Sequence, residues 1–114
     1  MSIALFDGNL RDGWFYTEEH DIAEYSDLLL TVKCAEGARS HVFQIRVEAG
    51  LYFAGELYWF TIMAQETTYV YVENDKEATL VYPHISIERY VKLRVKMRAL
   101  SGKPMFKLHA HLET

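Results

Sequence analysis

The sequence predicts an all-β protein, an antiparallel β-sandwich of the jelly-roll type. Two segments near the C-terminus carry this prediction, because in each of them apolar and polar side chains alternate with a period of two. Residues 90–98 alternate four apolar side chains with Lys92, Arg94, Lys96 and Arg98, and residues 106–112 alternate four with Lys107, His109 and His111. Each strand therefore has one buried and one solvated face. Short strands separated by turn residues favour a sandwich or jelly roll.

The remaining strands are expected at intervals along the chain, with a possible helix only at 21–30. The predicted strands are 3–6, 14–17, 28–34, 41–48, 57–64, 68–73 and 79–82, with turns or loops at 7–9, 18–27, 35–40 and 49–55. Residues 57–64 read L-Y-W-F-T-I-M-A. Because both faces of this segment are apolar, we expect a central strand covered on both sides, with Trp59 in the core. Residues 99–104 form either a hairpin within one sheet or an arch between two sheets.

Length and composition indicate one globular domain, residues 1–114. Hydrophobic residues make up 50% and charged residues 25% of the chain, which excludes a disordered protein. The single Cys34 cannot form an internal disulfide. No apolar run is long enough to span a membrane, and the N-terminus lacks a signal-peptide pattern. We therefore expect synthesis in a cytoplasm, with assembly into a virion as an alternative destination.

Charge is distributed unevenly along the chain. The net charge is −4, so nucleic acid is not an expected partner. Residues 1–30 hold seven acids and one base, whereas residues 89–114 hold seven bases and one acid. Either the two ends lie side by side in the fold and offset one another, or they form a polarised surface that directs docking of partners or of further copies.

The order of several short motifs resembles the galactose-binding-like jelly rolls, and among them the carbohydrate-binding modules of xylanase-type enzymes. The motifs that carry the resemblance are Gly13-Trp14, 28–32, 40–44, 47–52, 58–64, 69–72, 90–93 and 101–108. The chain departs from that family in its short length and in the sequence of its last strand, 108–112, which has no Asp. The resemblance implies a jelly roll that binds carbohydrate and sometimes holds a structural calcium ion.

Two groups of residues are candidate metal ligands. Asp7 and Asp12 lie near Asn9 in a glycine-containing turn, and oxygen ligands of this kind suit calcium. His109 and His111 have the spacing that places two imidazoles on one strand face, which suits zinc or copper if a third ligand lies nearby. The alternative for both groups is ordinary turn chemistry and solvated side chains.

Aromatic and basic side chains are the candidate ligand-binding residues. Tyr69 and Tyr71 share one strand face, where both rings could stack on a sugar ring. Trp14 could stack on a sugar in the same way. The basic residues Lys92, Arg94 and Lys96 could contact an acidic ligand, or could simply be solvated and protect a strand edge. No nucleophile and base can be paired, so we expect no enzyme activity.

Two functions follow from these residues. The first is a non-catalytic binding module for a carbohydrate or another extended surface, contacted through Tyr69, Tyr71, Trp14 and the basic strand. The second is a self-assembling structural component of a virus or phage particle, as a decoration, capsid or tail protein. In that case the acidic end of one copy would dock on the basic strand of the next, giving a homo-oligomer.

Overall fold

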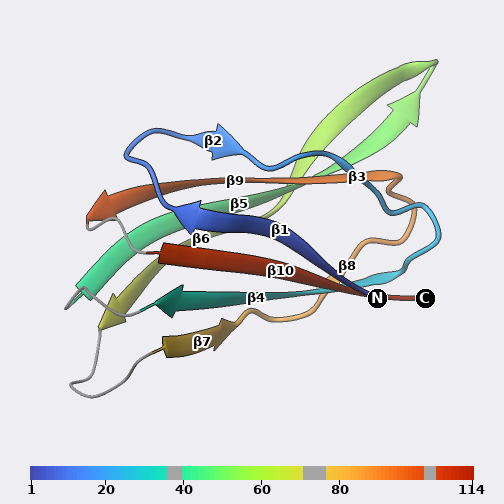
Figure 1. Cartoon of the computed structure of the whole chain (residues 1–114). Coiled ribbons are helices and arrows are strands. Elements are labelled where there is room, and N and C mark those ends of the chain that lie inside the picture. Colours follow the sequence, from blue (N-terminus) through green and yellow to red (C-terminus); the bar gives the residue numbers. More distant parts are fainter. Residues whose placement is uncertain (36–39, 71–76, 102–104) are drawn as a thin grey trace.

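The computed structural model describes residues 1–35, 40–70, 77–101 and 105–114, and every regular element within these ranges is a β-strand. Figure 1 shows the strands in two layers. In chain order they are β1 (Ser2–Asn9), β2 (Phe15–Tyr16), β3 (His20–Asp21), β4 (Asp27–Ala35), β5 (Ser40–Phe53), β6 (Glu56–Val70), β7 (Glu77–Val81), β8 (Ile85–Ser86), β9 (Lys92–Ser101) and β10 (Met105–Glu113).

The order of the strands identifies the fold as a jelly roll. One sheet has the order β1-β10-β4-β7 with β8 beside β4, and the other has the order β2-β9-β5-β6 with β3 beside β9. Without the two-residue strands β3 and β8, the first strand pairs with the last, the second with the second-to-last, and so on inward to the β5–β6 hairpin. This nested antiparallel pairing describes one long hairpin rolled into two sheets, as in a jelly roll. The predicted fold class is confirmed.

Alternating side chains from both sheets form the core. Phe43 of β5 meets Phe106 of β10 edge to face, with ring centroids 5.0 Å apart. Leu93, Val95 and Met97 on β9 are fully buried, as the period-two pattern predicts. Aromatic pairs in this geometry stabilise a core beyond the area that they bury.

The last two strands do not form a hairpin within one sheet. β9 and β10 lie in different sheets, β9 beside β5 and β10 between β1 and β4. The polar faces of the two strands are therefore on opposite sides of the molecule. Lys92, Arg94, Lys96 and Arg98 lie on the outer face of one sheet, and Lys107, His109 and His111 on the outer face of the other.

Several expectations about local structure were wrong. No helix forms at 21–30, and the loop expected at 18–27 contains β3 and the first residue of β4. The turn expected at 7–9 is part of β1, because these residues continue the ladder with β10. The loop expected at 49–55 is strand to Phe53, where β5 turns directly into β6. The strand at 57–64 is not central, because it belongs to β6, which in the described residues pairs with β5 alone and forms the edge of its sheet.

The β5–β6 hairpin extends beyond the rest of the sandwich, as Figure 1 shows at the upper right. β5 pairs with β9 from Val42 to Gly50, but it pairs with β6 as far as Phe53, which lies opposite Glu56. We call the projecting part, residues 51–58, the overhang. Ala54 and Gly55 connect its strands, with φ angles of 51° and 82°. Positive φ at both positions is the geometry of the type I′ turn that suits a twisted two-stranded ribbon.

Candidate interaction sites

The overhang presents apolar side chains on the face that forms the core elsewhere in the same hairpin. Leu51, Phe53, Tyr58 and Phe60 line a hollow of about 210 Å³. Phe60 lies opposite Ala49, which is fully buried in the core, and the other three continue its face towards the tip. The ring of Tyr90 lies 6.4 Å from that of Phe60, at the base of the overhang. Beyond this point, the hollow opens to solvent.

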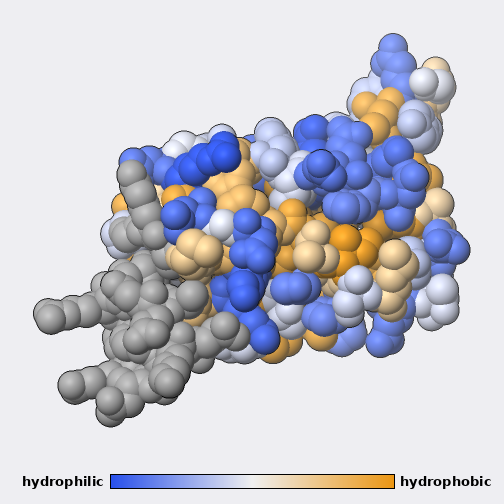
Figure 2. All heavy atoms as spheres, in the orientation of Figure 1, coloured by the Kyte–Doolittle hydropathy of each residue, from blue (hydrophilic) through white to orange (hydrophobic). Residues whose placement is uncertain are grey.

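Exposure of this face is high. Phe53 is 72% exposed, more than any other large apolar side chain in the described residues, while Tyr58 is 46% and Phe60 47% exposed. Tyr52, on the opposite face, is 55% exposed. Figure 2 shows the overhang as a projection with apolar residues at its surface. A tip that is apolar on both faces is typical of a protein contact surface.

A second cluster, which we call the aromatic–cationic face, covers the outer side of the β2-β9-β5-β6 sheet. The guanidinium of Arg94 lies 4.4 Å from the ring of Tyr16 and 4.0 Å from the ring of Trp59. Trp59 is therefore half-buried on the outer face, and its predicted place in the core was wrong. Cations at these distances from aromatic rings are attracted by the negative ring faces.

Trp14 is the second anchor of the aromatic–cationic face. The guanidinium of Arg98 lies 4.6 Å and that of Arg46 5.0 Å from its ring centroid, and the ammonium of Lys96 lies 5.2 Å away. Because three cations already contact this one ring, a sugar that stacked on Trp14 would have to share or displace them.

Acidic side chains of the same chain pair with basic side chains of β9. The buried carboxylate of Glu48 accepts a hydrogen bond from Nε of Arg94 at 2.7 Å, and Nζ of Lys96 is 4.0 Å away. Lys92 pairs with Asp21, and this hydrogen bond raises the pKa of Lys92. Strand β3, which contains Asp21, pairs with β9, so the acidic and basic ends of the sequence do meet within one copy.

The structure brings some of the predicted ligand-binding residues together and leaves others untested. Trp14, Arg94 and Lys96 share the aromatic–cationic face, with Lys92 at its end. Tyr69 lies opposite His41 in the β5–β6 ladder, at the end of the hairpin away from the overhang. Tyr71 lies outside the described residues, so the predicted pairing of Tyr69 and Tyr71 as a sugar platform stays a prediction.

Metal ligands do not cluster in the part of the chain that the structure describes, where no group of three or more His, Cys, Asp or Glu side chains is placed to hold an ion. The calcium ligands predicted from Asp7 and Asp12 stay a prediction. In His111, Nδ1 lies 2.7 Å from the hydroxyl of Ser2 and Nε2 lies 3.1 Å from that of Thr31. Both ring nitrogens therefore have partners on neighbouring strands, which explains this histidine structurally.

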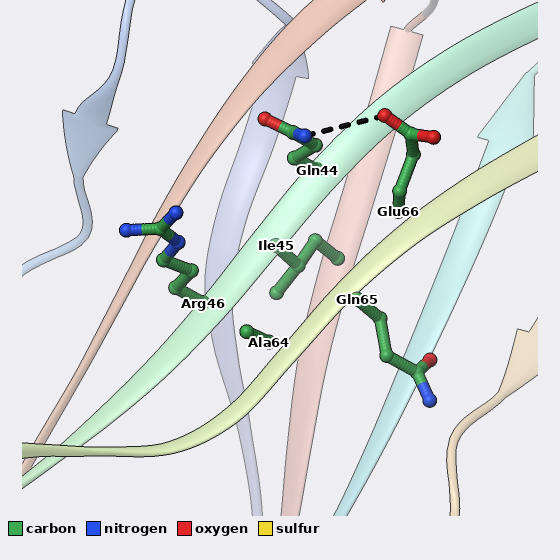
Figure 3. Close-up of a pocket in the computed structure, with 6 residues that line it drawn as sticks. All are labelled: Gln44, Ile45, Arg46, Ala64, Gln65 and Glu66. Carbon is green, nitrogen blue, oxygen red and sulfur yellow. Dashed lines mark hydrogen bonds between the residues drawn. The ribbon is translucent and has the colours of Figure 1, made fainter.

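Two further features bear on chemistry. Burial raises the pKa of the Cys34 thiol to about 11, so this residue is a poor nucleophile at neutral pH. A polar hollow of about 220 Å³ lies across β5 and β6, and there the amide of Gln44 donates a hydrogen bond to Glu66 at 3.2 Å (Figure 3). Arg46 and Gln65 point away from one another to either side of it. None of its lining residues forms a nucleophile–base pair.

Comparisons with known proteins found little. No protein-family model matches the chain, and no curated protein matches it. Among solved structures, the chain is similar to one described as the structure of infectious bursal disease virus Gx strain, with 10% identity and a TM-score of 0.42. The alignment covers 96% of this chain but 31% of the viral chain, so this chain spans about a third of the length of that neighbour. No helix in the described residues is long and apolar enough to cross a membrane.

The overhang is the site that sequence reasoning missed, although its signal was present. Residues 57–64 are apolar on both faces, and we assigned them to a strand covered within the chain. The pattern correctly indicates a strand, but the expected cover on both faces was wrong, because Tyr58 and Phe60 are about half exposed. Gly55, a turn residue directly between two apolar runs, was the available indication of a hairpin tip.

Proposed function

We propose that this protein is a non-catalytic structural subunit that self-assembles into a larger particle, of which a virion is the setting we favour. The observation that carries the proposal is the overhang, a piece of core-facing sheet that no other strand among the described residues covers. Jelly rolls are common in viral capsid proteins and in lectins, so the fold suits both assembly and carbohydrate binding. The overhang favours assembly.

The size of the apolar surface supports a protein contact. An aromatic side chain has roughly 150–250 Å² to bury. With the exposed fractions of Phe53, Tyr58 and Phe60, these three rings leave on the order of 300 Å² open to water. Burying that area would contribute up to about 7 kcal/mol per copy before the costs of association. A small monomer gains nothing from leaving it exposed.

A carbohydrate-binding module is the second candidate, favoured by the exposed Tyr16 on the aromatic–cationic face. An acidic sugar could stack on this ring and meet the neighbouring cations. The candidate is weaker, because Arg94 and Lys96 already contact Tyr16 and pair with Glu48. A screen of neutral and acidic glycans tests it, with a Tyr16→Ala variant as the control for any glycan retained.

Molar mass in solution tests self-assembly. We expect light scattering behind size exclusion to give a mass above that of the 13.3 kDa chain, rising with protein concentration. Because the proposed contact is apolar, the mass should persist in high salt, which screens charges but not apolar burial. A monomer at every concentration and salt would refute self-assembly. An oligomer that high salt dissociates would instead indicate docking through the charged ends.

A further inference from the structure

We propose that the overhang binds the overhang of a second copy around a two-fold axis, so that each supplies the apolar layer that the other lacks. This inference rests on the self-assembly proposed above, and it specifies the partner, the face and the symmetry. The contact surface is the face formed by Leu51, Phe53, Tyr58 and Phe60. The opposite face of the overhang, which contains Tyr52, stays outside the contact.

The first argument is continuity with the core. Within the sandwich, Ala49 and Val47 on this face of β5 are buried against the opposite sheet. Two residues further on, the same face continues through Leu51 and Phe53, but the opposite sheet has ended. Sheets pack face to face about 10 Å apart, so a second overhang at that distance would continue the layering of each sandwich.

The second argument is the absence of charge. Residues 49–55 and 57–64 contain no charged side chain. A two-fold contact sets a surface against itself, so charges in its centre would meet their own copies and repel. Glu56 is the one acid in the overhang, and it accepts a hydrogen bond from the hydroxyl of Tyr58 at 3.1 Å. In an antiparallel stack it lies at the rim, where polar groups are typical of an interface.

The third argument comes from the turn. The first position of a type I′ turn favours Asn, Asp or Gly, because a left-handed backbone is strained for other residues. Here that position holds Ala54, with a φ of 51°. A solvated tip would be better served by Asn, which is both polar and tolerant of this conformation. An apolar residue at a position that disfavours it fits a tip that is covered by a partner.

The apolar area available for burial sets the expected affinity of the dimer. The three exposed rings of two copies amount to roughly 600 Å², and Leu51, Ala54 and the strand backbone add to this. The total approaches the ~1,000 Å² that marks the low end of specific interfaces. We therefore expect a dimer that dissociates in the micromolar range, about 1–100 μM, which requires measurements up to a few hundred micromolar.

Two substitutions at adjacent tip residues on opposite faces test the geometry. Phe53→Asp places a charge in the proposed contact, and Tyr52→Asp places the same charge on the other face at a similarly exposed site. By sedimentation equilibrium, we expect Phe53→Asp to weaken dimerisation at least ~10-fold, because it removes a large aromatic contact and buries a charge under the partner. Tyr52→Asp should change it less than about threefold. Circular dichroism and thermal melting confirm that both variants fold.

The outcomes separate this inference from the proposed function. If wild-type protein is monomeric throughout, both are wrong. If wild-type protein assembles and Phe53→Asp leaves its mass unchanged, or Tyr52→Asp disrupts it equally, the protein self-assembles through another surface and this inference is overturned.

Crosslinking gives a measurement that does not depend on a charged variant. In the two-fold stack, Leu51 lies near the centre, so Leu51→Cys brings two thiols together across the axis. A short bis-maleimide should then produce a dimer band in a denaturing gel, whereas Tyr52→Cys should not. Cys34 is buried with a raised pKa, and the unaltered protein measures its background. Equal crosslinking of the two variants would contradict the proposed face.

Discussion

The two halves of the β5–β6 hairpin share the apolar alternation of β5 but have different surroundings. In the half near β9, Phe43, Ile45 and Val47 point at the opposite sheet and are fully buried. In the overhang, Leu51 and Phe53 continue the same alternation, but Phe53 is 72% exposed. The strand pairing is continuous through both halves. The difference therefore lies in the layer opposite, which covers the apolar face of the first half and leaves that of the overhang exposed.

The largest expected effect is a loss of unfolding free energy, and it should occur in one half of the hairpin and not in the other. Phe43→Ala removes a core ring that packs on Phe106, and such changes cost about 3–5 kcal/mol of unfolding free energy. Phe53→Ala should cost within ~0.5 kcal/mol in dilute monomer, because water already surrounds the ring. Urea denaturation at low protein concentration measures both values. Similar losses in the two variants would show that the overhang is stabilised within its own copy, and would remove the basis for an interface there.

The same contrast shows what the sequence could predict. The alternation in 92–98 and 106–112 correctly assigned the buried side chains within those two segments, because a period of two depends only on local strand geometry. It did not extend to Ala99, which was assigned to the connection but is buried in β9. Whether those strands formed a hairpin or an arch was left open, because the pattern is the same in both. The edge position of β6 was missed for a related reason. An apolar pattern on both faces of a strand does not show whether other strands of the same chain pack against those faces.

The aromatic–cationic face was predicted in part. Trp14, Arg94 and Lys96 were named as neighbours of a ligand, and the structure does bring them together. Their mutual contacts were not foreseen, because they join strands β2, β5 and β9, which are far apart in the sequence. Glu48 is an example: it lies on the polar face of the alternating segment 41–48, yet it is buried beside Arg94. Pairing between distant strands is set by topology and not by local pattern.

The covered core, to which Cys34 of β4 belongs, should also respond to alkaline pH. Burial raises the pKa of Cys34 from 9.0 to about 11, so the native state keeps a proton that the unfolded chain releases. The stabilisation is therefore complete below pH 9 and is lost as the pH rises towards 11. We expect unfolding free energy to fall by roughly 2 kcal/mol over this range on account of this thiol.

Urea denaturation isolates that contribution when wild-type protein is compared with a Cys34→Ala variant. We suggest measurements at about pH 8, 9.5 and 10.5, which lie below and between the pKa values of the thiol in the unfolded and folded states. The variant is needed because burial also raises the pKa of Tyr82, which acts in the same direction. Parallel pH profiles for the two proteins would mean that Cys34 ionises equally in both states and is not enclosed as the structure shows.

The boundary between the two halves is Gly50, and a substitution there tests how the overhang is attached. A Cβ at this position would lie 2.9 Å from Cδ1 of Leu57, 3.2 Å from Cβ of Lys92 and 3.3 Å from the ring of Trp59. Gly50→Ala should therefore cost about 1–2 kcal/mol, as overpacking does. Gly13→Ala, where a Cβ meets nothing within 4 Å, is the matched control. Equal stability of the two variants would show that Leu57 and Trp59 shift easily.

The smallest effect concerns the turn, where one substitution should change monomer stability and dimerisation in opposite directions. Ala54→Asn relieves the left-handed strain and should raise the stability of the monomer by about 0.5–1 kcal/mol. If the tip is covered by a second copy, the polar amide should at the same time weaken dimerisation, because it would be buried without an assured partner. Thermal melting of dilute protein and sedimentation of concentrated protein measure the two effects separately. A variant that melts higher and assembles as well as wild type would show that Ala54 lies outside the contact, which would place the interface nearer to Phe60 than to the tip.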